Sequence, residues 1–167
     1  VRDGNQLYQQ KQYTDASVAY KKALGNSANY DKANYNLGNA MYQNNNFKEA
    51  APQYELSAKT ATNKFAKAEA YHNLGNSMME TKNFQGAVDA YKNSLRNNPN
   101  DDETRYNLAV AQELLEKEKQ DQKDDKNKDK KDNKDQDKKD KDDQNKDKNN
   151  ASHFTCFKGR ISLTGSL

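Results

Sequence analysis

The chain has few of the residues that catalysis, cross-linking or metal binding require. Its 167 residues include a single cysteine, Cys156, so no disulfide can form within the chain. Its two histidines, His72 and His153, lie far apart, and neither has the neighbouring histidine of a zinc site. A glycine-rich phosphate loop, a Gly-x-Ser-x-Gly elbow and a Ser–His–Asp set are also missing. We therefore expect no catalytic residue, no metal and no cofactor, and predict that the chain is not an enzyme.

Long apolar runs and a strong charge bias are missing too. No stretch approaches the roughly 20 apolar residues that span a bilayer, and no signal peptide is evident. Residues 1–120 carry 15 basic and 14 acidic side chains, residues 121–150 carry 11 of each, and residues 151–167 carry two basic and no acidic ones. Without a basic stripe to neutralise phosphates, nucleic-acid binding is not expected. The chain opens on Val1 without Met, so we expect residue 1 to be a boundary left by processing or truncation.

Composition divides the chain into three segments. Residues 1–120 contain enough apolar side chains to fold. Residues 121–150 consist only of Asp, Lys, Asn and Gln, and a segment with nothing to bury is predicted to be disordered. Residues 151–167 then change character, with Phe154, Cys156, Phe157, Ile161, Leu163 and Leu167 and no acid. This last segment remains unassigned: a short adhesive strand, a docking peptide and a non-native end are all open.

A repeated motif organises the first segment. Tyr35-Asn-Leu-Gly-Asn39 returns as His72-Asn-Leu-Gly-Asn76 and, more loosely, as Tyr106-Asn-Leu-Ala-Val110. After Gly4, Gly38 and Gly75 come an aromatic residue, an alanine and a tyrosine at identical offsets. Gly4 to Gly38 is 34 residues, Gly38 to Gly75 is 37, and Gly75 to Ala109 is 34. A fixed period near this length predicts a stacked array of helical hairpins.

The spacing and residue types resemble the tetratricopeptide repeat (TPR). The resemblance covers about residues 1–120 and implies an all-α fold: a TPR helical-hairpin solenoid of three repeats, then a C-terminal capping helix and a disordered tail. The predicted helices are 2–10 and 12–25, 31–43 and 46–59, 66–81 and 83–97, and about 102–119. Repeated glycine in helix interiors predicts that helix backbones approach closely at Gly38 and Gly75. Three extra residues within 58–67 lengthen either a helix or a loop.

Steps of 100° per residue place one polar row on the same face of each first helix. In TPR arrays this face lines a concave groove that binds extended peptides or partner helices. Asparagine amides both donate and accept hydrogen bonds, so they suit a peptide backbone. We expect Asn36 and Asn73 to lie off the stripe that packs between helices. The alternative is a merely solvated face, with His72 as a polar aromatic without chemistry. The predicted partner-binding groove comprises Asn5, Lys32, Tyr35, Asn36, Asn39, Gln43, His72, Asn73, Asn76, Tyr106 and Asn107.

A narrower resemblance suggests a cellular setting. The opening Arg2-Asp-Gly-Asn-Gln-Leu-Tyr8, the two Asn-Leu-Gly-Asn blocks, and residues 100–109 followed by a Lys/Asp/Asn/Gln tail resemble the BatC-type proteins of the Bacteroides aerotolerance group. That resemblance implies a scaffold in a periplasmic or cell-envelope complex, beside membrane proteins with von Willebrand A domains and a MoxR-type ATPase. It implies no membrane insertion of this chain itself.

A generic TPR adaptor or co-chaperone that recognises C-terminal peptides is the alternative function. Co-chaperones of this kind grip acidic C-termini with Lys and Arg residues beside asparagines. Asn5 and Asn36 fit that pattern. Glu69 and Asn73, however, stand where the third repeat would carry its cations, and this disfavours the alternative.

Overall fold

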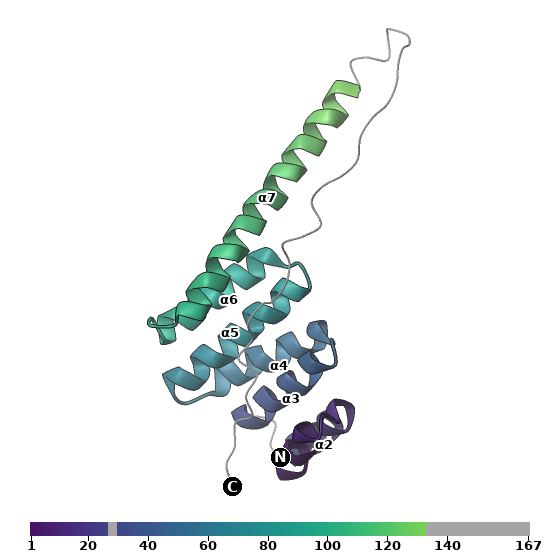
Figure 1. The fold of residues 1–167 in the computed structure, drawn as a ribbon, viewed down its shortest axis with the longest axis vertical. Helices are drawn as coiled ribbons and strands as arrows, with labels where there is room; N and C mark the ends of the chain where they lie inside the picture. The colour runs from purple at the N-terminus through teal and green to yellow at the C-terminus, as the bar shows by residue number, and fades with distance from the viewer. Residues whose placement is uncertain (27–29, 133–167) are drawn as a thin grey trace.

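The computed structural model describes residues 1–26 and 30–132 of the chain (Figure 1). These residues form seven α-helices and no strand. The helices are α1 (Arg2–Gln9), α2 (Tyr13–Asn26), α3 (Asp31–Gln43), α4 (Phe47–Thr60), α5 (Lys64–Glu80), α6 (Phe84–Asn97) and α7 (Asp102–Asp132). The predicted all-α hairpin solenoid is therefore confirmed, and each predicted helix has its counterpart.

Each helix packs against the helices that precede and follow it in the chain, so the hairpins stack in a row (Figure 1). The first helices of the hairpins are α1, α3 and α5, and α7 takes the next place in that series. The second helices are α2, α4 and α6. This nearest-neighbour packing is typical of a solenoid, in which each repeat is stabilised by the interfaces with its neighbours. Within the described residues, no helix has the length and apolar character needed to cross a membrane.

A glycine on each first helix faces a tyrosine ring on the second helix of the same hairpin. An added Cβ would lie 2.5 Å from a Tyr20 ring atom at Gly4 and 2.4 Å from a Tyr91 ring atom at Gly75. Gly38 faces Tyr54 in the same way, at 2.8 Å. These three tyrosines are fully buried. The predicted contact at Gly38 and Gly75 was between helix backbones, whereas the structure places a tyrosine side chain of the second helix there. The space that this ring occupies explains why glycine recurs despite its cost of about 1 kcal/mol in a helix interior.

The turn inside each hairpin has the same backbone conformation. Lys11, Asn45 and Lys82 occupy equivalent positions and have φ values of 60°, 59° and 58°. The backbone amide of the residue that follows each of them donates a hydrogen bond to the preceding helix. For example, the Asn46 amide donates to the Met41 carbonyl at 2.9 Å. A left-handed residue of this kind ends a helix sharply and lets the next one start antiparallel to it. No glycine marks these turns in the sequence.

Two helices are longer than expected. The extra residues before the third repeat lengthen the helix rather than the loop, because α5 has 17 residues where α3 has 13. Asn63 caps its start by accepting a hydrogen bond from the Ala66 amide at 2.7 Å.

The last helix, α7, continues to Asp132 instead of ending near residue 119. The prediction that residues 121–150 are disordered is therefore wrong for 121–132. The ion pair between Lys119 and Glu116, three residues apart, supports the helix just before this segment without burial. Residues 133–150, and the unassigned segment 151–167, lie outside the described residues.

Candidate functional site

The predicted groove residues lie along the first helices in what we call the inner row, and hydrogen bonds hold its asparagines and Tyr35 in place. Its recurring unit is an asparagine whose side-chain oxygen accepts the hydroxyl of the buried tyrosine. Tyr20 donates to Asn5 at 2.8 Å, and Tyr54 donates to Asn39 at 2.9 Å. Tyr91 donates to Asn76 at 2.7 Å. The glycine, the tyrosine and the asparagine therefore act as one packing unit in each hairpin.

The same row connects one hairpin to the next. Asn36 on α3 donates to the oxygen of Asn5 on α1 at 3.0 Å. Asn73 on α5 donates to the Tyr35 hydroxyl on α3, also at 3.0 Å. Asn107 on α7 donates to the oxygen of Asn76 on α5 at 3.3 Å, and this bond is equivalent to the one between Asn36 and Asn5. Bonds of this kind, each contributing about 0.5–1.5 kcal/mol, help to fix the spacing of the first helices.

The expectation that Asn36 and Asn73 lie off the packing between helices is wrong. Both bridge neighbouring first helices, and both are almost fully buried. Tyr35, Asn39, His72, Asn76 and Asn107 are buried as well. These residues recur in register partly because stacking requires them. Their contact with a partner remains a prediction.

Burial sets the hydrogen-bonding direction in the row. It raises the pKa of Tyr54 well above its ordinary value, and desolvation likewise raises the pKa values of Tyr20 and Tyr91. The hydroxyls therefore stay protonated and donate, which makes the asparagine oxygens acceptors. The amide nitrogen of Asn76 then has no hydrogen-bond partner among the described residues, although it is buried.

His72 is the centre of a polar cluster between α5 and the start of α7. Its Nδ1 lies 2.6 Å from the Thr104 hydroxyl oxygen. That hydroxyl donates to Asp101 at 2.7 Å, and the Thr104 amide donates to the other Asp101 oxygen at 3.1 Å. On the other side of the ring, Nε2 lies 3.6 Å from a Glu103 carboxylate oxygen. Because Thr104 uses its proton on Asp101, His72 donates from Nδ1, and the cluster joins α7 to the array.

Lys32, Gln43 and Tyr106 are the accessible members of the predicted set. All three are exposed, and Tyr106 has 67% of its surface accessible. Tyr106 occupies the same repeat position as Tyr35, which is 3% exposed beside the following first helix. Asn5 is half-buried at the other end of the row. A partner would therefore reach the row through these exposed edges.

Sequence reasoning missed several residues at this face. Asp101 accepts a hydrogen bond from the Thr104 amide, which is the ordinary role of an acidic residue at a helix start. Its connection through Thr104 to His72 was not expected. No sequence motif at residues 101–106 indicates this connection, because His72 and Thr104 lie 32 residues apart in the chain.

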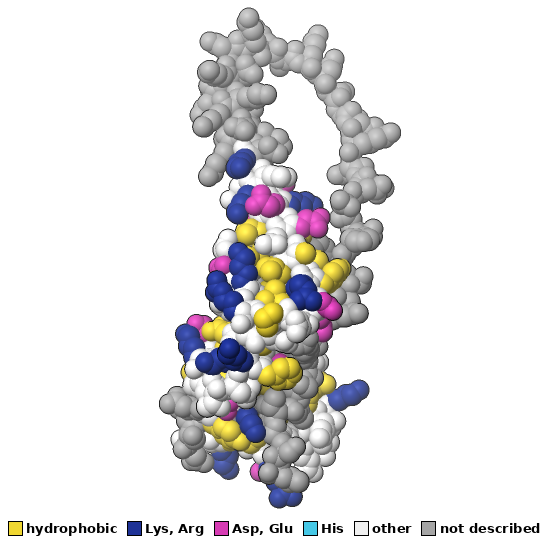
Figure 2. Space-filling model, turned by 90° about the vertical axis from the view of Figure 1, so that its left-hand side faces the viewer, with side chains coloured by type: hydrophobic (Ala, Val, Ile, Leu, Met, Phe, Trp, Pro, Cys, Tyr) yellow, Lys and Arg dark blue, Asp and Glu magenta, His cyan; other side chains and the backbone are white. Residues whose placement is uncertain are grey.

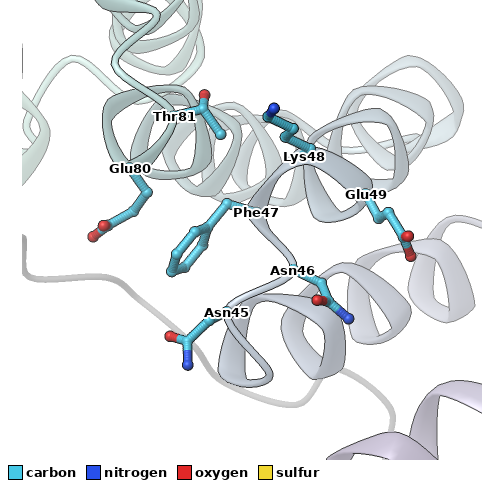
Figure 3. Close-up of a pocket in the computed structure, with 7 residues that line it drawn as sticks. All are labelled: Asn45, Asn46, Phe47, Lys48, Glu49, Glu80 and Thr81. Carbon is cyan, nitrogen blue, oxygen red and sulfur yellow. The ribbon is translucent and has the colours of Figure 1, made fainter.

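An open pocket of about 350 Å³ lies at the turn between α3 and α4, next to the end of α5 (Figure 3). The Phe47 ring lies between the side chains of Glu80 and Asn45 (Figure 3). Tyr42 supports it, with its ring 4.9 Å from that of Phe47 and its hydroxyl donating to Glu80 at 3.4 Å. None of the pocket residues was predicted to bind a partner, and Phe47 enters the sequence pattern only as the aromatic residue that recurs nine positions after each glycine.

Surface charge is mixed over the described residues. Lysine, arginine and acidic side chains are interspersed on the face in Figure 2, with hydrophobic side chains gathered at the height of α6 and the first half of α7. In the part of the chain that the structure describes, no group of three or more histidine, cysteine or acidic side chains is arranged to hold a metal ion.

Comparison with known proteins identifies the repeats. Residues 4–45 match a family model described as TPR repeat, and residues 68–101 match one described as tetratricopeptide repeat. A search of curated proteins gave no significant match.

Solved structures of TPR domains share the fold. The Sgt2 TPR domain from Aspergillus fumigatus is 21% identical, with a TM-score of 0.62 over 71% of this chain and 78% of that one. The first TPR domain of human RPAP3 is 19% identical, with a TM-score of 0.63 over 71% and 91%. The first TPR of Spaghetti (RPAP3), bound to the HSP90 peptide SRMEEVD, is 20% identical, with a TM-score of 0.62 over 68% and 88%. At these identities the likeness shows the fold alone.

Proposed function

We propose that this chain, which carries tetratricopeptide repeats, is a non-enzymatic protein–protein interaction scaffold that holds a partner segment along its inner row. The observation that carries the proposal is the repetition of the asparagine–tyrosine unit on successive first helices. A TPR domain of similar fold was solved with a peptide bound, which supports a peptide-binding role for such an array.

The hydrogen-bonded row makes the face rigid before a partner arrives. Amides that are already ordered lose little conformational freedom on binding, and preorganisation of this kind improves affinity. Exposed Gln43 and Tyr106 add a polar and an aromatic contact at the edges of the row.

The charge of the face favours a neutral or basic partner over an acidic one. Glu69 and Glu103 lie at its α5–α7 end, and exposed Lys32 is the cation at the start of α3. An acidic C-terminal peptide would meet the like charges of Glu69 and Glu103, and like-charge contacts weaken binding. The co-chaperone alternative is therefore the less favoured function.

The cellular setting belongs to the same proposal. A place in a periplasmic or cell-envelope aerotolerance complex, with von Willebrand A domain proteins and a MoxR-type ATPase system, is supported by the sequence blocks at residues 2–8 and 100–109. Pulldown with a purified von Willebrand A domain, in parallel with an acidic C-terminal peptide, separates this setting from the co-chaperone alternative. Binding of the acidic peptide alone would reject the envelope setting.

The experiment for the binding face uses exposed residues, so that folding is not disturbed. A partner captured from envelope extract is titrated against the Gln43→Ala, Tyr106→Ala double variant and against a Val18→Ala, Lys92→Ala control on the second helices. Each lost contact costs about 0.5–1.5 kcal/mol, so the double variant should bind roughly 5- to 150-fold more weakly. Equal affinities for the two variants would show that the partner binds elsewhere.

A further inference from the structure

The pocket between the α3–α4 turn and the end of α5 belongs to a series of three equivalent sites. At each, the aromatic residue that begins a second helix lies next to the end of the following first helix. We call them the first, middle and last turn sites, built on Tyr13, Phe47 and Phe84. The pocket is the middle one, where Glu80 ends α5 and Thr81 caps it. The two other sites show which residues the chain places in the same columns.

The first turn site is bridged by a hydrogen bond. Asn44 occupies the column of Thr81 and donates its side-chain amide to the Thr14 hydroxyl at 3.2 Å. Gln43 occupies the column of Glu80, and its side chain is neutral. At this site the two hairpins are therefore joined through uncharged side chains.

The last turn site is apolar. Leu114 occupies the column of Glu80, and Leu115 follows it. Both leucines are partly buried and pack, together with Phe84, against the apolar cluster of the last hairpin and α7. The column therefore holds Gln43, Glu80 and Leu114 in turn, and only the middle turn site carries a charge in it.

The middle turn site brings an aromatic ring and a carboxylate together at an open cavity. The Phe47 ring lies between the side chains of Glu80 and Asn45, and it is half-buried, so part of the ring is accessible (Figure 3). Tyr42 orders both neighbours, because its ring packs edge-on to Phe47 and its hydroxyl donates to Glu80. A carboxylate accepts several hydrogen bonds at once, and among the described residues no lysine or arginine forms a salt bridge with Glu80.

An arginine side chain matches this chemistry. Its planar guanidinium stacks on an aromatic face and pairs with a carboxylate through two parallel hydrogen bonds. The side-chain oxygen of Asn45 can accept a further N–H. The cation of the pocket, Lys48, points toward Thr81 and away from Glu80 (Figure 3). With Glu49 the lining holds two carboxylates against one ammonium, and its volume of about 350 Å³ suits one side chain rather than a folded element.

We propose that the middle turn site binds an arginine side chain of the partner segment, stacked on Phe47 and paired with Glu80. The proposal rests on the proposed function in one respect, since it assigns the arginine to the same partner. Glu80 shares its column with Gln43 of the inner row, so the pocket continues that row at the turn end of the hairpins. The added content is specificity: the partner carries an arginine where it crosses this edge.

The pocket is tested first without any partner. N-acetyl-arginine N-methylamide is titrated into the full chain while NMR follows the ring signals of Tyr13, Phe47 and Phe84. The Phe47 signals should shift and saturate, while those of the two equivalent rings should not move. The citrulline analogue, which has the same shape without the charge, should bind about tenfold more weakly, and the lysine analogue should also bind more weakly.

Three results of this titration would overturn the proposal. Equal shifts of the three rings, or no shift at Phe47, would remove the site. Equal affinity for the arginine and citrulline analogues would show that charge is not recognised. Equal affinity for the arginine and lysine analogues would contradict recognition of a planar guanidinium.

A single substitution tests the carboxylate. Glu80→Gln places in the third repeat the residue that the second repeat already carries in this column, and it keeps an oxygen for the Tyr42 hydroxyl. This variant should bind the arginine analogue about tenfold more weakly than the wild type. Glu113→Gln, at an exposed position on α7, is the matched control and should leave the affinity unchanged. Equal affinities for the two variants would overturn the pairing with Glu80.

The captured partner separates this inference from the proposed function. Weaker partner binding by both Glu80→Gln and the Gln43→Ala, Tyr106→Ala variant would support the two together. Weaker binding by the double variant alone would reject the arginine site and leave the scaffold function standing. Arginine binding at Phe47, with partner binding unaffected by the double variant, would reject the inner row as the scaffold face and leave the arginine site standing.

Discussion

Substitution of Gly75 by alanine tests the contact on which each hairpin is built. The new Cβ would lie 2.4 Å, 2.6 Å and 2.8 Å from three ring atoms of Tyr91. The ring is fully buried and its hydroxyl is bonded to Asn76, so it cannot move without breaking that bond. The substitution therefore overpacks the core and disturbs the neighbouring polar contact.

Two terms oppose each other in the expected result. Overpacking costs about 1–3 kcal/mol and loss of the hydroxyl bond about 1 kcal/mol, whereas alanine gains about 1 kcal/mol of helix propensity over glycine. The net destabilisation should be about 1–3 kcal/mol. Chemical denaturation followed by circular dichroism measures it. Gly25→Ala is the matched control, since nothing lies within 4 Å of its added Cβ, and it should be neutral or stabilising.

A second substitution identifies the cause. In a Tyr91→Leu background the ring is gone, so Gly75→Ala should cost little or become favourable, and the double-mutant cycle should show strong coupling. Gly38→Ala should cost less than Gly75→Ala, because its closest ring atom is 2.8 Å away rather than 2.4 Å. Equal stability of Gly75→Ala and wild type, or a cost that remains in the Tyr91→Leu background, would refute the close-approach argument.

Two further predictions follow from the turns and the buried tyrosines. Lys82→Gly should stabilise the protein by up to about 1 kcal/mol, because glycine adopts the left-handed backbone at φ 58° without strain. Lys92→Gly, inside α6, should destabilise the protein by about 1 kcal/mol. Denaturation midpoints that fall for both variants would contradict the strain argument. Burial raises the pKa of Tyr54 well above its ordinary value, so the unfolded chain loses this proton first, and stability should fall above about pH 10 by roughly 1.4 kcal/mol per pH unit for this group. The slope of stability against pH from 9.5 to 11 should become shallower in Tyr54→Phe than in the wild type, and an unaltered slope in this variant would count against the prediction.

The repeating frame could be predicted because several residues must recur together. Gly38 and Tyr54 are separated by the same number of residues as Gly75 and Tyr91, because the tyrosine ring fills the space beside the glycine. That constraint sets the period and with it the hairpins. The left-handed conformation of the turns escaped prediction, although their positions did not, because Asn45 and Lys82 adopt it without the glycine that usually marks it.

The surroundings of the inner row could not be predicted from one helix at a time. A step of 100° per residue places Asn36 and Asn73 on a common face, but it does not say what lies opposite. In the structure the neighbouring first helix lies there, and it supplies Asn5 and the Tyr35 hydroxyl. The length of α7 was missed for a different reason, since lack of apolar residues was taken to exclude helix beyond 120.

The most direct test of the scaffold function is site-specific photocrosslinking to the captured partner. A photoreactive phenylalanine analogue is placed at Tyr106 on the inner row or at Val18 on α2, two positions with 67% and 63% exposure. Because the exposures match, any difference in yield reports where the partner lies. The account predicts a crosslink from position 106 and none from position 18. Equal yields from both positions, or a crosslink from position 18 alone, would contradict it.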